Sequence, residues 1–278
     1  YLGQKVPGFP RHPHRGFETL TVVSKGFIDH ADSLGASARY GDGDAQWLTA
    51  GDGINHSEMF PLFSQNGNNK LDFFQIWLNL PSYNKRVEPN FEMYWKDEIP
   101  KISSNLNGNK NVQVEIITGD YLDYSSPIAP KNSWANNKKN DVAVWIIRLD
   151  SNGNFAIPNT KSGAKRNLYV LKGSNMEIDG QSISGGSMVT LDSSKNTVIK
   201  NLGSKTKILM LQGVPINEPV VKYGPFVMNT RSEIEQAFYD YNRTEFGGWK
   251  WGNSDPVHGT QKEKFAKLIS GKIIKPSK

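Results

Sequence analysis

Two short motifs contain residues of the types and spacing expected for a metal-binding site. They are His-Pro-His at residues 12–14 and His-Ser-Glu at residues 56–58, each with two potential ligands at positions i and i+2. On an extended strand, such side chains point to the same face. If the two strands face each other in a barrel, three imidazoles and one carboxylate converge, a set suited to a first-row transition metal with open positions left for reaction. The predicted ligands are His12, His14, His56 and Glu58.

A single His-x-His motif is often no more than two polar residues on a half-exposed strand. The second motif, at the same spacing and preceded by a glycine-rich turn, favours metal binding for the two motifs together. His30 and His258 have no partner at ligand spacing. We therefore expect both to be surface or loop histidines.

Both motifs lie in longer runs that resemble the signature of the pirin family, a branch of the cupin superfamily. These runs are GFPRHPHRGFET at 8–19 and GDAQWLTAGDGINHSEM at 43–59. The resemblance continues at FQIWLNL (74–80), VEP (87–89), EPV (218–220) and GPFVMNT (224–230). It covers most of the chain, strongly in the first hundred residues, weakly from 101 to 215, and strongly again after that.

The resemblance implies a mononuclear divalent transition metal, Fe(II), held in the first of two barrels. Many metal-binding cupins use a carboxylate at the position of Glu18, but in pirins the later carboxylate, here Glu58, takes that role. We therefore expect Glu18 to orient a histidine from outside the ligand shell. No histidine lies between residues 142 and 211, so a second site of this type cannot form there.

The elements that position these ligands are predicted to be strands. Short apolar runs alternate with turn residues, and aromatic residues and glycine are abundant, which favours an all-β fold. A stretch rich in Asn and Lys at 130–140 separates two β series of similar size. Two barrels fit this division, and the resemblance implies a bicupin, that is, two double-stranded β-helix (jelly-roll) barrels, with a C-terminal helix.

We expect four segments along the chain. They are an N-terminal cupin barrel with the metal site (1–125), a linker (126–141), a C-terminal cupin barrel without metal (142–229) and a C-terminal helical tail (230–278). In the tail, Thr230 and Glu233 form the pattern of a capping box, and Gly247-Gly248 ends the helix. Residues 262–271 are predicted to form a second, weaker helix. Because pirin-like chains generally carry a few dozen residues before the position of Tyr1, the first barrel is expected to lack its first strands.

Composition narrows the remaining classes. The formal charge of +6 is spread along the chain, so no direct binding of nucleic acid is expected. No stretch has the length of a membrane span or the character of a signal segment, which predicts a cytoplasmic protein, or a nuclear one in a eukaryote. Trp47, Trp77 and the pair Phe73-Phe74 are expected in the core, whereas Gln46 and Gln75 are candidates for lining a pocket.

Two functions fit this pattern. As an enzyme, the chain would use its metal and dioxygen to open a flavonol such as quercetin, with Glu58 as a ligand or as acceptor of the flavonol proton. As a binding module, it would present an iron-dependent surface to a protein partner in transcriptional co-regulation. Both need the same four ligands, and the open coordination positions favour the enzyme. A third alternative is a fragment that binds no metal because its first barrel cannot close.

Overall fold

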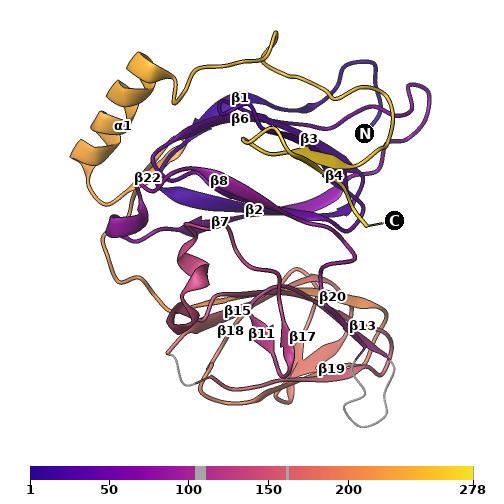
Figure 1. The fold of residues 1–278 in the computed structure, drawn as a ribbon. Helices are drawn as coiled ribbons and strands as arrows, with labels where there is room; N and C mark the ends of the chain where they lie inside the picture. Colours follow the sequence, from indigo (N-terminus) through magenta and orange to yellow (C-terminus); the bar gives the residue numbers. More distant parts are fainter. Residues whose placement is uncertain (104–110, 161–162, 278) are drawn as a thin grey trace. The chain divides into compact units, whose positions relative to one another are not determined.

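The computed structural model describes residues 1–103, 111–160 and 163–277. The chain forms two compact units (Figure 1). The first contains Tyr1–Glu98, Ala129–Trp134 and Ile216–Lys278, and the second contains Ile99–Ile128 and Ala135–Pro215. No helix within the described ranges is long and apolar enough to cross a membrane.

The first unit is built from two facing sheets, and the chain passes between them several times (Figure 1). One sheet has the order β1 (Gly8–His14), β6 (Ile54–Met59), β3 (Phe27–Asp32), β4 (Ser37–Gly41), β23 (Phe265–Lys267) and β24 (Ile273–Ile274). The other has the order β7 (Asp72–Asn79), β2 (Phe17–Lys25), β5 (Ala45–Thr49) and β8 (Asn90–Tyr94). Ile28, Tyr40, Leu48, Ile54 and Phe91 are part of the apolar core of this unit.

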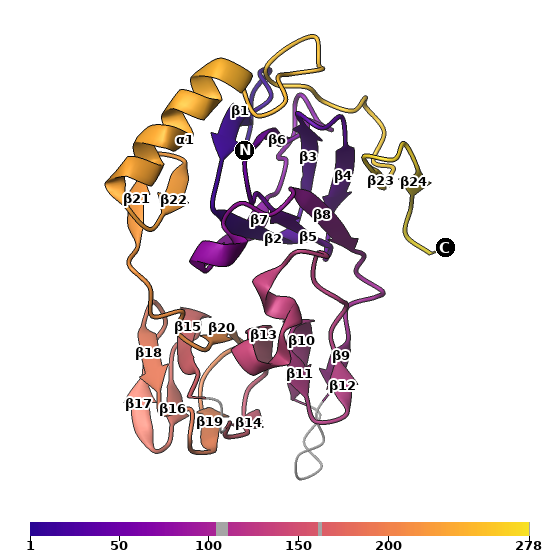
Figure 2. The same ribbon diagram turned by 60° about the vertical axis from the view of Figure 1, so that its left-hand side comes forward.

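The last part of the first unit adds a hairpin and a helix. The hairpin pairs β21 (Val221–Tyr223) with β22 (Phe226–Met228), and the helix α1 (Arg231–Thr244) lies beside it (Figure 2). The predicted capping box is confirmed, because Thr230 accepts from the backbone of Glu233 and the Glu233 side chain accepts in return. Ile234 and Ala237 pack against Phe226, which fixes the helix to the hairpin.

The second unit consists of two sheets and a short hairpin. The larger sheet has the order β18 (Met188–Leu191), β15 (Lys165–Lys172), β20 (Thr206–Gly213), β13 (Ala143–Leu149), β10 (Val112–Thr118) and β9 (Lys101–Ser103). The smaller has the order β14 (Asn154–Ile157), β19 (Thr197–Asn201), β16 (Met176–Ile178) and β17 (Gln181–Ile183). In the hairpin, β11 (Asp120–Tyr121) pairs with β12 (Tyr124–Ser125).

Short 3-10 turns occur at three places in the described chain: Ser82–Asn84, Trp134–Asn136 and Lys138–Asn140.

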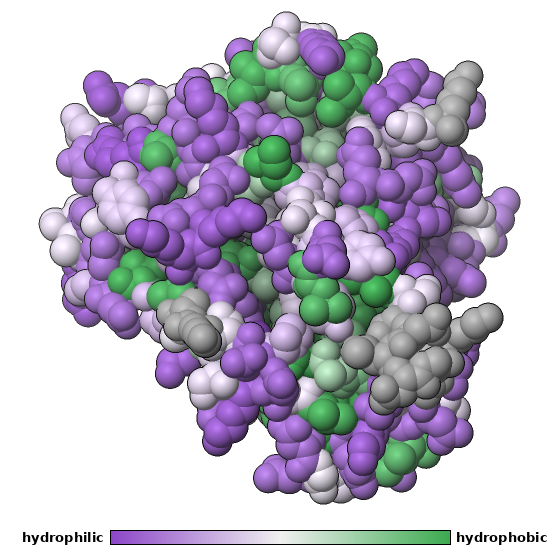
Figure 3. Space-filling model, turned by 60° about the horizontal axis from the view of Figure 1, so that its bottom comes forward, coloured by the Kyte–Doolittle hydropathy of each residue, from purple (hydrophilic) through white to green (hydrophobic). Residues whose placement is uncertain are grey.

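An apolar cluster fills the second unit. It includes Trp145, Phe155, Leu168, Ile199 and Met210, and all five are at most 2% exposed. Apolar residues on the face shown in Figure 3 form separate groups among hydrophilic side chains. Isolated exposed apolar residues are normal on a protein surface. The all-β fold with one α-helix is therefore confirmed for the described residues, with strands forming both units.

The boundaries of the two units differ from those of the four predicted segments. β9 and β10 were assigned from sequence to the first barrel, but they pair with each other, and β10 pairs with β13 in the second unit. Residues 216–229, assigned to the second barrel, belong to the first unit. Pairing between strands far apart in the chain decides these boundaries, and composition does not reveal such pairing.

The predicted second helix at residues 262–271 is wrong. Phe265–Lys267 forms β23, which pairs antiparallel with β4, and its partner β24 follows. Without β23, the edge of β4 would have unpaired backbone N–H and C=O groups. An extended segment forms hydrogen bonds with these groups, whereas a short, weak helix would not. The tail from residue 230 is thus one helix followed by an arm that extends a sheet.

A buried ion pair holds β3, β4 and this arm together. The Arg39 guanidinium donates to both carboxylate oxygens of Asp29, with Nε–Oδ1 2.7 Å and Nη2–Oδ2 2.6 Å. Arg39 also donates to the carbonyl oxygens of Gly259 and Gln261, and the backbone N–H of His258 donates to Asp29. Both charged side chains are at most 1% exposed.

We expect Arg39→Met to lower the free energy of unfolding by about 3–5 kcal/mol, because Asp29 would remain buried without its counter-charge. Urea denaturation followed by circular dichroism measures this loss. The matched control is Arg86→Met, since Arg86 is 57% exposed in its pair with Asp52, and the expected loss is about 0–1 kcal/mol. Equal losses in the two variants would contradict the role of the buried pair.

Candidate metal centre

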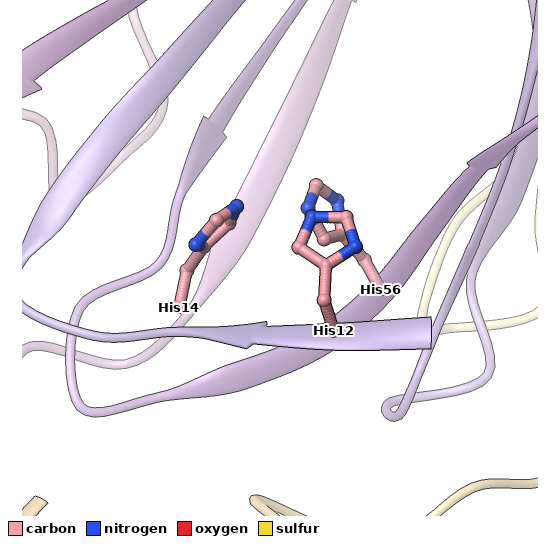
Figure 4. A group of neighbouring side chains, drawn as sticks. All are labelled: His12, His14 and His56. Atoms are coloured by element: carbon pink, nitrogen blue, oxygen red, sulfur yellow. The ribbon is translucent and has the colours of Figure 1, made fainter. Parts of the chain in front are cut away.

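Strand pairing brings the three predicted histidine ligands together. β1 and β6 are antiparallel, and His12 lies opposite His56 in their register. His14 follows two residues later and points to the same side, so the three rings gather in one group (Figure 4). The ring centroids are 4.4 Å apart for His12 and His56, and 4.8 Å apart for each of the other two pairs. One ligand nitrogen from each ring lies within 4.8 Å of the others.

Hydrogen bonds to backbone carbonyls orient two of the rings. Nδ1 of His12 donates to the carbonyl oxygen of Pro10 at 2.8 Å, and Nδ1 of His14 donates to that of Pro225 at 3.4 Å. A carbonyl oxygen can only accept, so Nδ1 carries the proton and Nε2 keeps its lone pair. This arrangement of the second nitrogen is the usual one for histidines that bind metals.

The remaining nitrogens fit a bound cation. Nε2 of His14 and both ring nitrogens of His56 are buried without a hydrogen-bond partner in the described structure. Buried polar atoms are normally paired, and a neutral imidazole offers one lone pair, so Nε2 of His14 and one nitrogen of His56 are available to bind a metal ion. Burial also lowers the pKa of His14 to about 3 and the pKa of His56 well below its ordinary value. Both rings are therefore neutral at pH 7, the state that binds metal.

Glu58 lies beside the histidines. Its Oε2 is 3.9 Å from Nε2 of His56, which is too long for a hydrogen bond. Nε2 of Gln75 donates to Oε1 at 2.9 Å and to Oε2 at 2.7 Å, and the Thr21 hydroxyl donates to Oε1 at 3.3 Å. The carboxylate is 2% exposed. Its role as fourth ligand remains a prediction.

Glu18 does not orient a histidine. Its carboxylate accepts from the hydroxyls of Thr49 at 2.6 Å and Ser133 at 2.9 Å, on the face of β2 opposite to that of Thr21. The turn at Gly16 separates β1 from β2 and requires φ +85°. The family resemblance suggested Glu18, but Glu18 and Thr21 are three residues apart on β2, so their side chains lie on opposite faces of that strand.

His30 and His258 differ in their surroundings. The prediction for His30 is wrong, because it is fully buried in β3, its Nε2 donates to Asp32 at 3.1 Å, and its ring centroid is 5.5 Å from that of His56. His258 lies in a loop as predicted, and its Nε2 donates to the carbonyl oxygen of His30 at 2.7 Å. Every residue of β3 is buried, so its sequence does not alternate between apolar and polar residues. His30 could therefore not be recognised as an interior residue from such a pattern.

The rings of Trp77 and Phe17 form an aromatic wall next to His14. Trp77 is 39% exposed, and its ring centroid lies 4.3 Å from that of Phe17 and 5.4 Å from that of His14. Nζ of Lys222 lies 4.6 Å from the centroid of Trp77. Trp47 is buried in the core as predicted, but the core assignment of Trp77 is wrong. The positions of Gln75 and Trp77 two residues apart on β7 were the available signal for a shared face.

The two β units and the buried histidine cluster define a cupin-type protein with a candidate metal centre. The family model described as "Pirin" matches residues 2–78, and that described as "Pirin C-terminal cupin domain" matches residues 144–247. A relative from Pseudomonas aeruginosa named "Putative quercetin 2,3-dioxygenase PA2418" is 31% identical, over 87% of this chain and 80% of its own. Human "Pirin" is 31% identical, over 89% and 80%. The chain belongs to the pirin family.

A solved structure agrees with this assignment. The crystal structure of quercetin 2,3-dioxygenase from Acinetobacter baumannii is 30% identical, with a TM-score of 0.78, and the match covers 89% of this chain and 82% of that one. The bicupin class predicted from the sequence is therefore confirmed.

We predict that His56→Ala loses most of the metal that the wild-type chain carries, because an ion held by three imidazoles becomes under-coordinated when one is removed. Elemental analysis of dialysed protein measures the content. His258→Ala is the control and should keep the wild-type content. Full occupancy in His56→Ala would contradict the assignment.

The environment of Glu18 predicts a pH dependence of stability. Burial raises the pKa of Glu18 from 4.5 to about 7, against the hydrogen bonds from Thr49 and Ser133. The folded state then keeps a proton that the unfolded state loses, so wild-type stability falls as pH rises from 4.5 to 7. Glu18→Gln lacks this loss. Its stability relative to wild type should rise by up to about 3 kcal/mol across that window in urea titrations, and parallel curves would contradict the assignment.

Proposed function

We propose that this chain is a metal-dependent dioxygenase that opens a flavonol such as quercetin, with Fe(II) held by His12, His14, His56 and Glu58. The observation that carries the proposal is the group of three imidazoles whose ligand nitrogens lie within 4.8 Å of one another. A set of nitrogen ligands and one carboxylate suits Fe(II) and leaves positions for substrate. When bound, the metal would supply the Lewis-acid and redox chemistry of the reaction.

The aromatic wall supports a planar substrate. The ring of Trp77 is partly exposed beside His14 and is backed by Phe17, so it offers a surface on which an aromatic substrate can stack. Nζ of Lys222 lies over the same ring, so this side chain would turn aside when a substrate stacks there and could then pair with an acidic hydroxyl group. A substrate that combines aromatic rings with an acidic hydroxyl group would be attracted by both features. Flavonols have this combination.

Glu58 has the chemistry to accept a proton. A carboxylate next to the histidines can take the proton of the flavonol hydroxyl, or it can bind the cation directly. The names of the relatives from Pseudomonas aeruginosa and Acinetobacter baumannii support quercetin as the type of substrate. The buried strands around the histidines would keep bulk water from the reacting group.

We predict that iron-loaded protein consumes oxygen when quercetin is added, and that Glu58→Gln lowers the rate at least about 100-fold. The amide keeps the shape of the side chain but removes its negative charge and its ability to accept the proton. An oxygen electrode measures uptake after anaerobic addition of the flavonol. Glu88→Gln, which changes an exposed carboxylate, is the control with wild-type uptake.

Uptake that persists unchanged in Glu58→Gln would place the chemistry elsewhere. Iron that binds fully and changes oxidation state reversibly without turnover would favour the regulatory alternative over the enzyme.

A further inference from the structure

We propose that Gln75 is a positioning residue that aims the carboxylate of Glu58 at the histidine cluster and so sets the metal affinity of the site. This inference rests on the metal site of the proposed function, but it does not depend on the substrate. Glu58 is a proposed ligand of the metal. Gln75, in contrast, has no described hydrogen bond to any of the three histidines.

The amide of Gln75 has a fixed orientation. The indole N–H of Trp77 donates to Oε1 of Gln75 at 3.3 Å. Because an indole can only donate and a carboxylate can only accept, the amide oxygen must face Trp77 and the amide nitrogen must face Glu58. Trp77, Gln75 and Glu58 therefore form one directed chain of hydrogen bonds that leads from the partly exposed indole to the buried carboxylate.

Strand register places this chain across the interior of the first unit. Gln75 on β7 lies opposite Thr21 on β2, and both side chains reach Glu58, which comes from β6 of the facing sheet. The carboxylate is held from the side opposite to its own strand. It therefore has a defined position before any metal binds.

The hydrogen bonds leave room for metal binding. Each carboxylate oxygen has two lone pairs, and Gln75 uses one on each oxygen. Oε2 is 3.9 Å from Nε2 of His56, so a remaining lone pair of this oxygen lies near one of the three histidines. Without Gln75, the hydroxyl of Thr21 at 3.3 Å would be the remaining described donor to this buried group. The carboxylate would then lose its orientation.

The test measures the affinity for Co(II) by competition with a chromophoric chelator. Gln75→Leu should bind Co(II) about 10–100-fold more weakly than wild type, the usual effect of removing a group that orients a ligand. Its visible Co(II) spectrum should move toward that of Glu58→Ala. Gln75→Met, closer in shape to glutamine, repeats the measurement if the leucine variant does not fold.

A double-mutant cycle separates positioning from general damage. In a Glu58→Ala background, Gln75→Leu should change the Co(II) affinity by less than about twofold, because the group that it positions is absent. Gln46→Leu is the matched control. Gln46 is a buried glutamine on β5 of the same sheet, with a described hydrogen bond from Tyr40 and none to Glu58, so this variant should keep wild-type affinity.

Three outcomes would overturn the inference. The first is wild-type Co(II) affinity in Gln75→Leu. The second is an equal loss of affinity from Gln75→Leu in the wild-type and Glu58→Ala backgrounds, and the third is a loss of affinity in Gln46→Leu as large as that in Gln75→Leu. A wild-type protein that binds no Co(II) would overturn the proposed metal site as well. A site that binds Co(II) as predicted but shows no oxygen uptake with quercetin would overturn the proposed function and leave the role of Gln75 intact.

Discussion

The first unit depends on keeping neutral imidazoles packed against one another at the centre of a β structure. His14 and His56 are at most 3% exposed, and Nε2 of His14 and both ring nitrogens of His56 have no hydrogen-bond partner in the described structure. Unpaired buried polar groups normally destabilise a fold. A cation shared by the rings would remove this penalty. The arrangement that is unfavourable in isolation would therefore favour metal binding.

Much of the surrounding structure serves to hold this arrangement in place. Lys85 is 1% exposed, and its ammonium donates to the carbonyl oxygens of Gly16 and Val227 and to the side chain of Asn79. Burial lowers the pKa of Lys85 to about 8. These bonds tie the turn after His14 to β22 and to the end of β7. Residues distant in sequence thus fix the ligand strand, as Pro225 does through its carbonyl oxygen.

The sequence predicted the ligand pairs because alternation along a single strand is a local property. His12, His14 and His56 needed the period of two and the pairing of their two strands, and β1 and β6 are neighbours in one sheet rather than strands that face each other across the barrel. The capping box at Thr230 was equally local. The expectation for Glu18 came from the family resemblance, whereas the fold directs its carboxylate to Thr49 and Ser133. His30 was misplaced because β3 is buried on both faces. These errors arise where tertiary contacts override the local pattern.

The contribution of Gln75 and the half-exposed position of Trp77 were not predictable in this way. Both depend on how two sheets face each other, which a period of two does not specify. The boundaries of the two units differ from the predicted segments for the same reason, since β10 pairs with β13 across a long separation in sequence and β9 pairs with β10. Short-range periodicity therefore predicted the candidate ligands, while the contacts of Gln75 and Trp77 became visible only in the fold.

The most direct test of the central claim is anomalous diffraction at the iron absorption edge from crystals of iron-loaded protein. We predict one anomalous peak in the first unit, from an iron ion bound by Nε2 of His12, His14 and His56 and by a carboxylate oxygen of Glu58. An iron ion bound through Nδ1 of these rings, a peak at another position, or no peak despite iron in solution would contradict the account.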